Sequence, residues 1–75
     1  MAGEAYIIVR LSLKSGEHVT LRKTCADGAA ATVALAALTD GMAAAGEIWH
    51  IEDMDDRQAW VKMDETACVD IGVSD

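Results

Sequence analysis

The sequence predicts an α+β fold in a single domain, residues 1–75, with the element order ββαβββ and one helix packed across an antiparallel sheet. The first observation behind this prediction is an alanine-rich stretch, Thr24–Gly46, whose composition strongly favours a helix. Segments in which apolar and polar residues alternate flank this stretch on both sides, which is typical of strands with one buried face. A chain of 75 residues is also too short for more than one core, and its core is only marginally large.

The first two strands are expected to form a hairpin. The first covers Ala5–Lys14 and the second His18–Lys23. Four apolar residues occupy every second position of the first strand: Ile7, Val9, Leu11 and Leu13. A two-residue turn would put the apolar residues of the two strands on opposite faces of the sheet. A three-residue loop that ends at Gly16, with this glycine in the left-handed conformation, pairs Leu11 with Val19 and creates one apolar face.

The expected helix begins at Thr24, which can act as the N-cap. Asp27 completes a pair like a capping box and places a negative charge at the positive end of the helix dipole. We expect the helix to end at Thr39–Gly41, because Gly41 can adopt the left-handed conformation that ends many helices. Residues Met42–Ala45 can add one more turn.

The two faces of this helix differ. The residues expected to face the core are Ala31, Leu35, Leu38, Met42 and Ala45. The opposite face has a single charge, Asp40, among small and apolar residues. These residues are Ala29, Ala30, Val33, Ala36, Ala37 and Ala44. Either alanine is simply tolerated at a helix surface, or the smooth face packs on a second molecule. The second interpretation predicts a homodimer with these residues in its interface.

Three more strands are expected after the helix. They are Glu47–Asp53, Gln58–Met63 and Cys68–Val73, and the last would turn Val69, Ile71 and Val73 inward. The register between the first two stays open, because each is apolar on both faces in places. A loop with an even number of residues pairs Ile51 with Trp60, and a loop with an odd number of residues pairs Ile51 with a residue next to Trp60. The pattern suggests that one sheet face, carrying Trp60, contacts something other than solvent.

The charge is distributed unevenly along the chain. The net charge is −7, and residues 1–40 hold four acidic and four basic residues, so the excess lies in the second half. Residues 41–75 hold nine acidic residues against Arg57 and Lys62. This balance argues against nucleic acid or an anionic membrane as a direct ligand and favours a basic partner. No apolar run has membrane-spanning length, and Ala2–Ala5 lacks the basic start of a signal peptide, so we expect a cytoplasmic protein.

Neither a metal site nor an active site is expected. Four residues could in principle ligate zinc: His18, Cys25, His50 and Cys68. No two of them have the spacing of a zinc finger or knuckle, so we expect no metal and no cofactor. The two cysteines are expected to be reduced, partly buried thiols, with a disulfide or a reactive thiol as the minority alternatives. His50 lies beside Glu52 and Asp53 and could pair with a carboxylate as a general base, although a strand histidine more often has a structural role. Because a phosphate-binding loop and a nucleophile elbow are also absent, we expect a protein that is not an enzyme.

The strongest functional signal is a group of acidic residues around one tryptophan. The predicted partner-binding residues are Glu47, Glu52, Asp53, Asp55, Asp56, Asp64, Glu65 and Trp60. They lie on or beside one hairpin and its following turn, so we expect them to share one end or edge of the sheet. The segment Asp53–Arg57 lacks the glycine and the helical flanks of an EF-hand, which argues against a specific calcium site. Carboxylates on a rigid hairpin can imitate phosphates and occupy a groove built for nucleic acid. The alternative is a charged loop that merely keeps a small protein soluble.

The segment between Ile51 and Gly72 contains a recurring pattern of strand and turn residues. Its positions are Ile51, Asp53, Arg57, Trp60, Val61, Asp64, Ala67, Val69, Ile71 and Gly72. This pattern, which covers about a third of the chain, is similar to the C-terminal part of a family of small actinobacterial proteins. The glycine and proline expected in the turns of that family are missing here. The resemblance implies a fold rather than a function.

The whole chain resembles the small phage-encoded anti-CRISPR proteins in its size, acidity, alanine-rich composition and lack of catalytic motifs. These proteins share no common motif, so the resemblance assigns no role to any individual residue. It implies an inhibitor without enzymatic activity that occupies a basic nucleic-acid-binding surface of its partner. The alternative is a small cytoplasmic regulatory or structural module that binds another partner and inhibits nothing.

Overall fold

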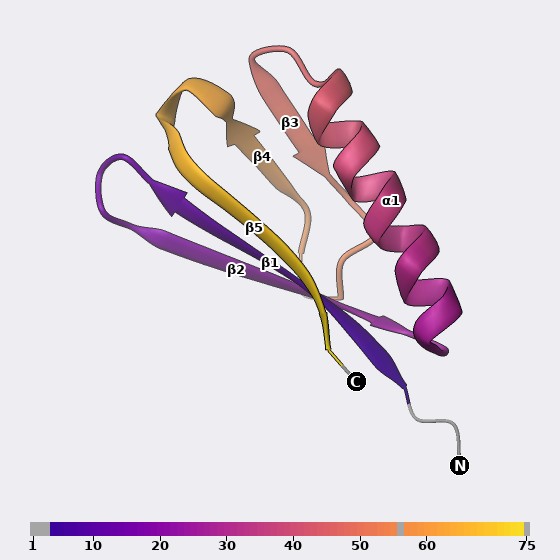
Figure 1. The fold of residues 1–75 in the computed structure, drawn as a ribbon. Coiled ribbons are helices and arrows are strands. Elements are labelled where there is room, and N and C mark those ends of the chain that lie inside the picture. Colours follow the sequence, from indigo (N-terminus) through magenta and orange to yellow (C-terminus); the bar gives the residue numbers. More distant parts are fainter. Residues whose placement is uncertain (1–3, 56, 75) are drawn as a thin grey trace.

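The computed structural model describes residues 4–55 and 57–74 and confirms the α+β fold with the order ββαβββ (Figure 1). A short 3-10 helix, η1, precedes the last strand. The elements are β1 (Ala5–Leu13), β2 (His18–Cys25), α1 (Gly28–Ala44), β3 (Ile48–Ile51), β4 (Ala59–Lys62), η1 (Met63–Glu65) and β5 (Thr66–Ser74).

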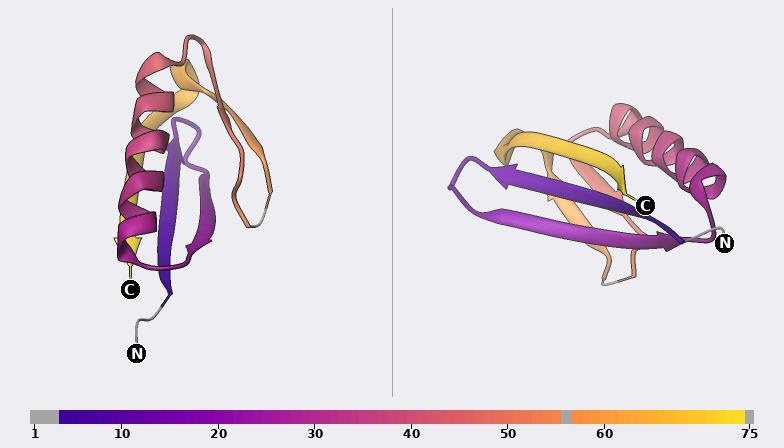
Figure 2. Two further views of the ribbon diagram at one scale, coloured as in Figure 1. Left: turned by 90° about the vertical axis from the view of Figure 1, so that its right-hand side faces the viewer. Right: turned by 60° about the horizontal axis from the view of Figure 1, so that its bottom comes forward.

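The strands form two antiparallel sheets. Strand β1 is the centre of a three-stranded sheet with the order β2-β1-β5, and β3 pairs with β4 in a separate hairpin. Helix α1 and the β3–β4 hairpin cover the same face of the larger sheet (Figures 1 and 2). The helix lies towards β5, and the hairpin lies towards β2. The opposite face of the larger sheet is not covered by any other element of the described chain.

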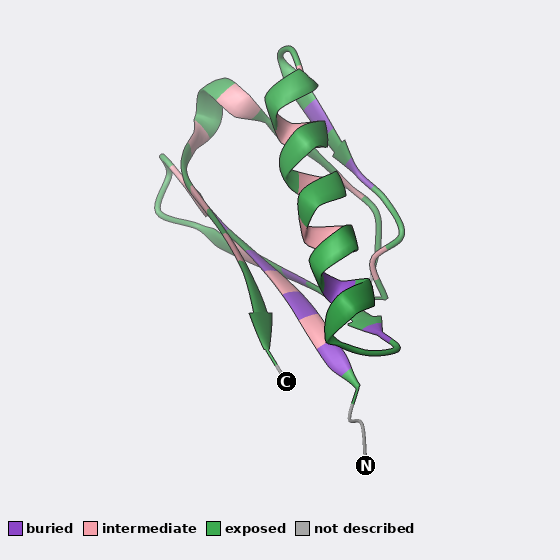
Figure 3. Ribbon diagram, turned by 45° about the vertical axis from the view of Figure 1, so that its right-hand side comes forward, coloured by how far each residue is buried: buried purple, intermediate pink, exposed green. Residues whose placement is uncertain are grey.

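The core lies between these two layers and is mainly aliphatic (Figure 3). Strand β1 supplies every second residue from Ala5 to Leu11, all of which are at most 2% exposed. The other buried residues are Leu21, Cys25, Ala31, Trp49, Ile51 and Val61. Burial of a large aliphatic side chain contributes roughly 1.5–3 kcal/mol. Ten buried residues therefore have to stabilise the described chain, which is a small number even for a domain of this size.

The predicted register of the first hairpin is confirmed. Leu11 lies opposite Val19, and the Leu13 N–H donates to the Glu17 carbonyl oxygen at 2.9 Å, which closes a three-residue loop. Gly16 in this loop has a φ of +95°, a conformation that favours glycine over residues with a side chain.

The helix begins later than expected, and it includes the further turn after Gly41 that the sequence allowed. Thr24 still belongs to β2, and Asp27 is the N-cap, because its Oδ1 accepts the Ala30 N–H at 2.8 Å. Gly41 does not end the helix but lies inside it. A Cβ atom at Gly41 would lie 3.6 Å from Nε1 of Trp49, an ordinary van der Waals distance, so this part of the helix lies beside β3.

The predicted core-facing side of the helix is confirmed. Ala31 is fully buried, and five further residues of this side are half-buried against the core: Ala34, Leu35, Leu38, Met42 and Ala45. Only Ala34 was missing from the prediction.

The structure settles the register of the second hairpin. Ile51 lies opposite Ala59, and Trp49 lies opposite Val61. This arrangement places the most apolar set of both strands in the core. In β5, Val69 and Ile71 are half-buried as expected, whereas Val73 is 42% exposed. Val73 lies opposite the buried Ile7 and so shares the inward face as predicted, but it stays partly exposed because β5 is an edge strand and this end of it is only partly covered.

Substitution Asp27→Ala should lower the free energy of unfolding by about 1 kcal/mol, because it leaves the Ala30 N–H without its acceptor. Urea unfolding followed by circular dichroism measures this loss. Asp40→Ala is the matched control, since Asp40 is an exposed acid inside the helix, where alanine has the higher helix propensity. Equal losses in both variants would contradict the assignment of Asp27 as the cap.

Candidate functional site

The outer face of the β3–β4 hairpin carries exposed apolar side chains. The pairs Ile48–Lys62 and His50–Trp60 point away from the core, and these four residues define the outer hairpin face. Trp60 is 65% exposed and Ile48 is 52% exposed. Large apolar side chains that are exposed together are typical of protein-binding surfaces.

The centre of the outer hairpin face is a pair of stacked rings. The ring centroids of His50 and Trp60 are 4.7 Å apart, and their planes differ by 5°. His50 Nε2 lies 2.9 Å from the Gln58 Oε1 atom, so a hydrogen bond to a side-chain amide orients the imidazole. His50 thus pairs with an amide rather than with a carboxylate, which fits the structural role expected of a strand histidine. Because stacking and hydrogen bonding hold both rings in place, a partner that binds them loses little side-chain entropy.

The acidic residues do not share one end of the molecule. Glu47, Asp64 and Glu65 form one group beside the start of β3 and at η1, and Glu52, Asp53 and Asp55 form a second group in the hairpin loop. The expectation that the acidic residues share one end was wrong. In an antiparallel hairpin the residues before β3 and after β4 lie at the open end, and the loop lies at the other end. Five residue steps along β3 separate Glu47 from Glu52, which corresponds to about 16 Å. Asp56 lies outside the described residues.

Hydrogen bonds fix the position of the first acidic group. The Met63 N–H donates to the Glu47 carbonyl oxygen at 3.0 Å, and the Lys14 N–H donates to the Glu65 carbonyl oxygen at 2.9 Å. This group therefore lies next to the loop of the first hairpin, while its carboxylates stay exposed.

Asp55 in the second group is attached to the outer edge of β2. Its Oδ2 accepts the Thr24 N–H at 2.8 Å and the Thr24 hydroxyl at 2.6 Å, and its own N–H donates to the Arg22 carbonyl oxygen at 2.8 Å. The Lys23 ammonium group donates to the carbonyl oxygen of Asp53 at 2.8 Å. These contacts fasten the hairpin loop to the larger sheet. Asp55 therefore has a structural role in addition to its charge.

The same contacts lower the pKa of Asp55. The hydrogen bond from the Thr24 hydroxyl is the largest cause and is partly opposed by desolvation. The hydrogen bond from the Thr24 backbone and the positive charges of Lys23 and Arg22 add smaller contributions in the same direction as the hydroxyl.

A groove of about 290 Å³ lies between α1 and β3. The helix contributes Ala34, Ala37, Leu38 and Gly41 to its wall, and the other wall includes residues Trp49–Met54. Ala37 of the predicted dimer face therefore faces the hairpin side. All six residues of that predicted face are exposed, and Val33 is 71% exposed.

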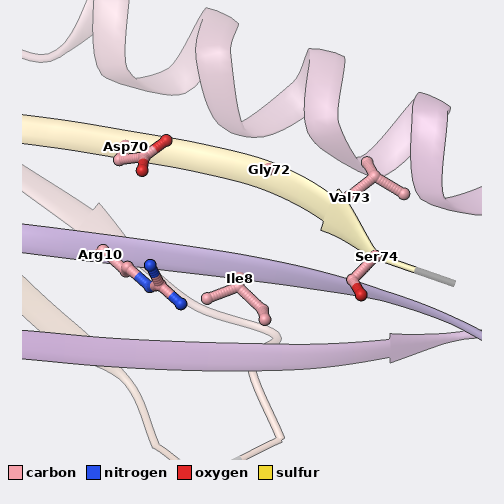
Figure 4. A pocket seen from close by; sticks show the side chains of 6 residues that line it. All are labelled: Ile8, Arg10, Asp70, Gly72, Val73 and Ser74. Carbon is pink, nitrogen blue, oxygen red and sulfur yellow. The ribbon is translucent and has the colours of Figure 1, made fainter.

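A second, shallow pocket of about 260 Å³ lies above β1 and β5 on the uncovered face of the larger sheet (Figure 4). Its lining residues are Ile8, Arg10, Asp70, Gly72, Val73 and Ser74. The floor at Gly72 is open, because a Cβ atom there would meet nothing within 4 Å.

The two cysteines lie at opposite ends of the larger sheet. Cys25 is buried opposite Ala5, and Cys68 is exposed opposite Ser12. Seven residue steps along β1 separate these positions, which is about 23 Å and excludes a disulfide within one chain. Among residues 4–55 and 57–74, no group of three or more His, Cys, Asp or Glu side chains could hold a metal ion. Within residues 4–55 and 57–74, no helix has both the length and the apolarity needed to cross a membrane.

Comparisons with family models, curated proteins and solved structures find no match to this chain.

The sequence identified Trp60 but not its partner ring or its apolar neighbour. The missing information was the register, because only the pairing of His50 with Trp60 brings the two rings together and puts Ile48 on the same face. Alternation of apolar and polar residues is weak in both strands, so no local pattern could have identified this face.

The contribution of Asp55 to stability should depend on pH. Because folding lowers the pKa of Asp55, the stabilisation is complete above the ordinary aspartate value of 3.8 and is lost as the pH falls through the lower pKa of the folded state. Wild type should therefore be more stable than Asp55→Asn at pH 7, and this difference should shrink at pH values below the lowered pKa.

Urea unfolding across this pH range measures the difference. Asp64→Asn removes the same charge in η1, away from β2, and is the matched control. A stability difference between wild type and Asp55→Asn that stays constant with pH would contradict the proposed role of the Asp55 carboxylate.

Proposed function

We propose that this protein is an inhibitor without enzymatic activity that binds a basic nucleic-acid-binding protein through the outer hairpin face. In its most concrete form it is an anti-CRISPR protein, which acts in the host cytoplasm and occupies the nucleic-acid groove of a CRISPR effector complex. The observation that carries the proposal is the exposed, stacked pair of Trp60 and His50, with Ile48 beside it and acidic groups at both ends of the hairpin.

An arginine-rich groove has the chemistry that this face can bind. A guanidinium group stacks well on a tryptophan ring and forms paired hydrogen bonds with carboxylates. Trp60 offers such a ring, and exposed acidic residues lie before β3 and in the hairpin loop. Tryptophan is also among the residues that contribute most to binding energy in protein interfaces.

The distance between the two acidic groups is compatible with a mimic of nucleic acid. Their separation of about 16 Å along β3 corresponds to roughly five nucleotide steps at about 3.4 Å per step along one strand. The hairpin and its flanks, residues 47–65, contain seven acidic and two basic residues. Such a charge excess accelerates association with a basic surface and repels free nucleic acid.

The apolar centre of the same face supports a second candidate function. Ile48 and Trp60 could bind a partner whose surface is apolar rather than basic, in which case the protein is a regulatory or structural interaction module. The two functions differ in their dependence on salt, because exposed charge pairs weaken as the ionic strength rises and apolar contacts do not.

The test measures binding of the purified protein to purified CRISPR effector complexes, together with competition against their target DNA. We expect affinity to fall as the salt concentration rises and target DNA to be displaced. Trp60→Ala should weaken binding by at least about tenfold, as expected for a residue at the centre of an interface. Glu52→Lys should also weaken binding and make it less dependent on salt.

The matched control is Val33→Ala, because Val33 is as exposed as Trp60 but lies on the helix. Absent binding to every effector complex tested, or binding that does not change with salt, would contradict the inhibitor proposal. Salt-independent binding to a different partner that is lost in Trp60→Ala would instead support the interaction module.

A further inference from the structure

We propose that the free edge of β5 pairs with β5 of a second copy of this chain. The result is an antiparallel dimer with one continuous six-stranded sheet, in which the two α1 helices pack against each other across the two-fold axis. This inference does not depend on the proposed function, because β5 and the side of α1 beside it lie away from the hairpin (Figure 2).

The first step of the argument is the difference between the two edges of the larger sheet. The outer edge of β2 is occupied at its C-terminal end, where Asp55 accepts the Thr24 N–H and donates to the Arg22 carbonyl oxygen, and β2 also contains the charged residues Arg22 and Lys23. Strand β5 pairs with β1 along one edge only. Its nine residues include neither lysine nor proline, which commonly protect an exposed edge from pairing.

The hydrogen-bond pattern identifies the free groups of β5. The Leu13 N–H bonds to β2, so by alternation the odd residues of β1 bond to β2 and the even residues bond to β5. The even residues of β5 therefore bond to β1. Val69, Ile71 and Val73 turn their N–H and C=O groups to the free edge.

The second step concerns the side of α1 that lies beside this edge. Five residues recur at alternating spacings of three and four: Ala29, Thr32, Ala36, Thr39 and Ala43. They form one exposed helical seam, on the side away from the groove that Ala34, Ala37 and Gly41 line. This spacing is that of the contact positions in paired helices. Because the groove faces β3, the helical seam lies on the side of α1 away from the β3–β4 hairpin, and β5 is the strand of the larger sheet farthest from that hairpin (Figure 2).

The helical seam is smooth as well as regular. The Thr32 hydroxyl donates to the Gly28 carbonyl oxygen at 2.9 Å, and the Thr39 hydroxyl donates to the Leu35 carbonyl oxygen at 3.0 Å. Both hydroxyls are thus satisfied within the helix. The alanines and the methyl groups of the threonines let a second helix approach to the short end of the usual 8–10 Å range.

The third step is the self-complementarity of β5. When the two-fold axis passes through Ile71, Val69 lies opposite Val73 of the second copy, and the exposed Val73 becomes covered. In this register Gly72 lies opposite Asp70 of the second copy. That carboxylate then enters the shallow pocket above Gly72, where Arg10 supplies a positive charge (Figure 4). An axis through Asp70 would instead place two carboxylates directly opposite each other, which is unfavourable.

Area and charge also favour a second copy as the occupant. The helical seam is about 25 Å long and β5 is about 30 Å long, and together they cover a strip about 20 Å wide. Two such strips bury on the order of 1,000 Å², the lower end of the range for specific interfaces. A chain of charge −7 repels its copies, so a stable self-contact needs a surface with few acids. The strip contains one acidic residue, Asp70, among the seam residues and β5.

This interface differs from the one predicted from the sequence. It keeps Ala29 and Ala36 but adds Thr32, Thr39 and Ala43, together with the edge of β5. The remaining residues of the predicted face lie outside it: Ala30, Val33, Ala37 and Ala44.

Sedimentation velocity at micromolar concentration tests the dimer. We expect wild type to be dimeric and Ala36→Glu to raise the dissociation constant at least tenfold, because two added charges meet in the helical seam. Ala30→Glu makes the same change on the other side of the helix and should leave the dimer intact. Val73→Pro removes a free edge donor and should dissociate the dimer, whereas Val73→Thr keeps that donor and should not. Circular dichroism verifies that each variant is folded.

A disulfide trap tests the register. In the proposed dimer Cys68 lies opposite Ser74 of the second copy in a non-hydrogen-bonded pair, with Cα atoms about 4.5 Å apart. Within one chain these residues are six steps apart on β5, about 20 Å, so they can join only between chains. Mild oxidation of Ser74→Cys should yield a covalent dimer on a non-reducing gel. The double variant Ser74→Cys/Cys68→Ser should not.

A wild type that is monomeric at the highest soluble concentration would overturn the proposal. So would a dimer that survives both Ala36→Glu and Val73→Pro, or one in which Ser74→Cys forms no cross-link. Trp60→Ala should leave the dimer unchanged. The dimer proposal and the partner-binding proposal can therefore be refuted independently of each other.

Discussion

The structure depends on the need to cover one apolar face of β1. This central strand presents Ala5, Ile7, Val9 and Leu11 to the same side, and these side chains are essentially inaccessible to water. One helix of small residues cannot cover that face together with those of β2 and β5. The second hairpin completes the cover with Trp49, Ile51 and Val61. Both covering elements therefore contribute to the single core.

Because the core is covered in this way, the outer hairpin face and the edge of β5 remain exposed. The β3–β4 hairpin has only two strands, so burying one face of it exposes the other, including Trp60 and Ile48. The hairpin loop reaches the edge of β2, where Asp55 forms hydrogen bonds with the backbone of Thr24 and Arg22. Nothing comparable covers β5 within the described chain. The molecule thus has one apolar face bordered by acids and one open strand edge on the other side.

The two surfaces are suited to different partners. The outer hairpin face carries aromatic rings and has carboxylates at both ends of the hairpin, and a basic protein surface is the partner proposed for it. The edge of β5 and the helical seam are nearly free of charge, which suits contact with an identical acidic chain. An arrangement of this kind would present two outer hairpin faces per dimer, and binding of both to one extended partner would raise the apparent affinity through the higher effective concentration.

The sequence by itself determined the element order, the first hairpin register and the core side of the helix. Each depends on a strong local pattern: strict alternation in Ala5–Lys14, a glycine at the loop, and apolar residues at helical spacing. Tertiary structure decided the rest. Both Thr24 and Asp27 are suitable N-cap residues by type. Thr24 is part of β2, where Asp55 accepts its backbone N–H, and Asp27 is the N-cap. The core decided which apolar residues of the second hairpin are buried, and this choice set the register, the separation of the acidic residues and the stacking on Trp60. A strand that is apolar on both faces carries no local signal of which face will be buried.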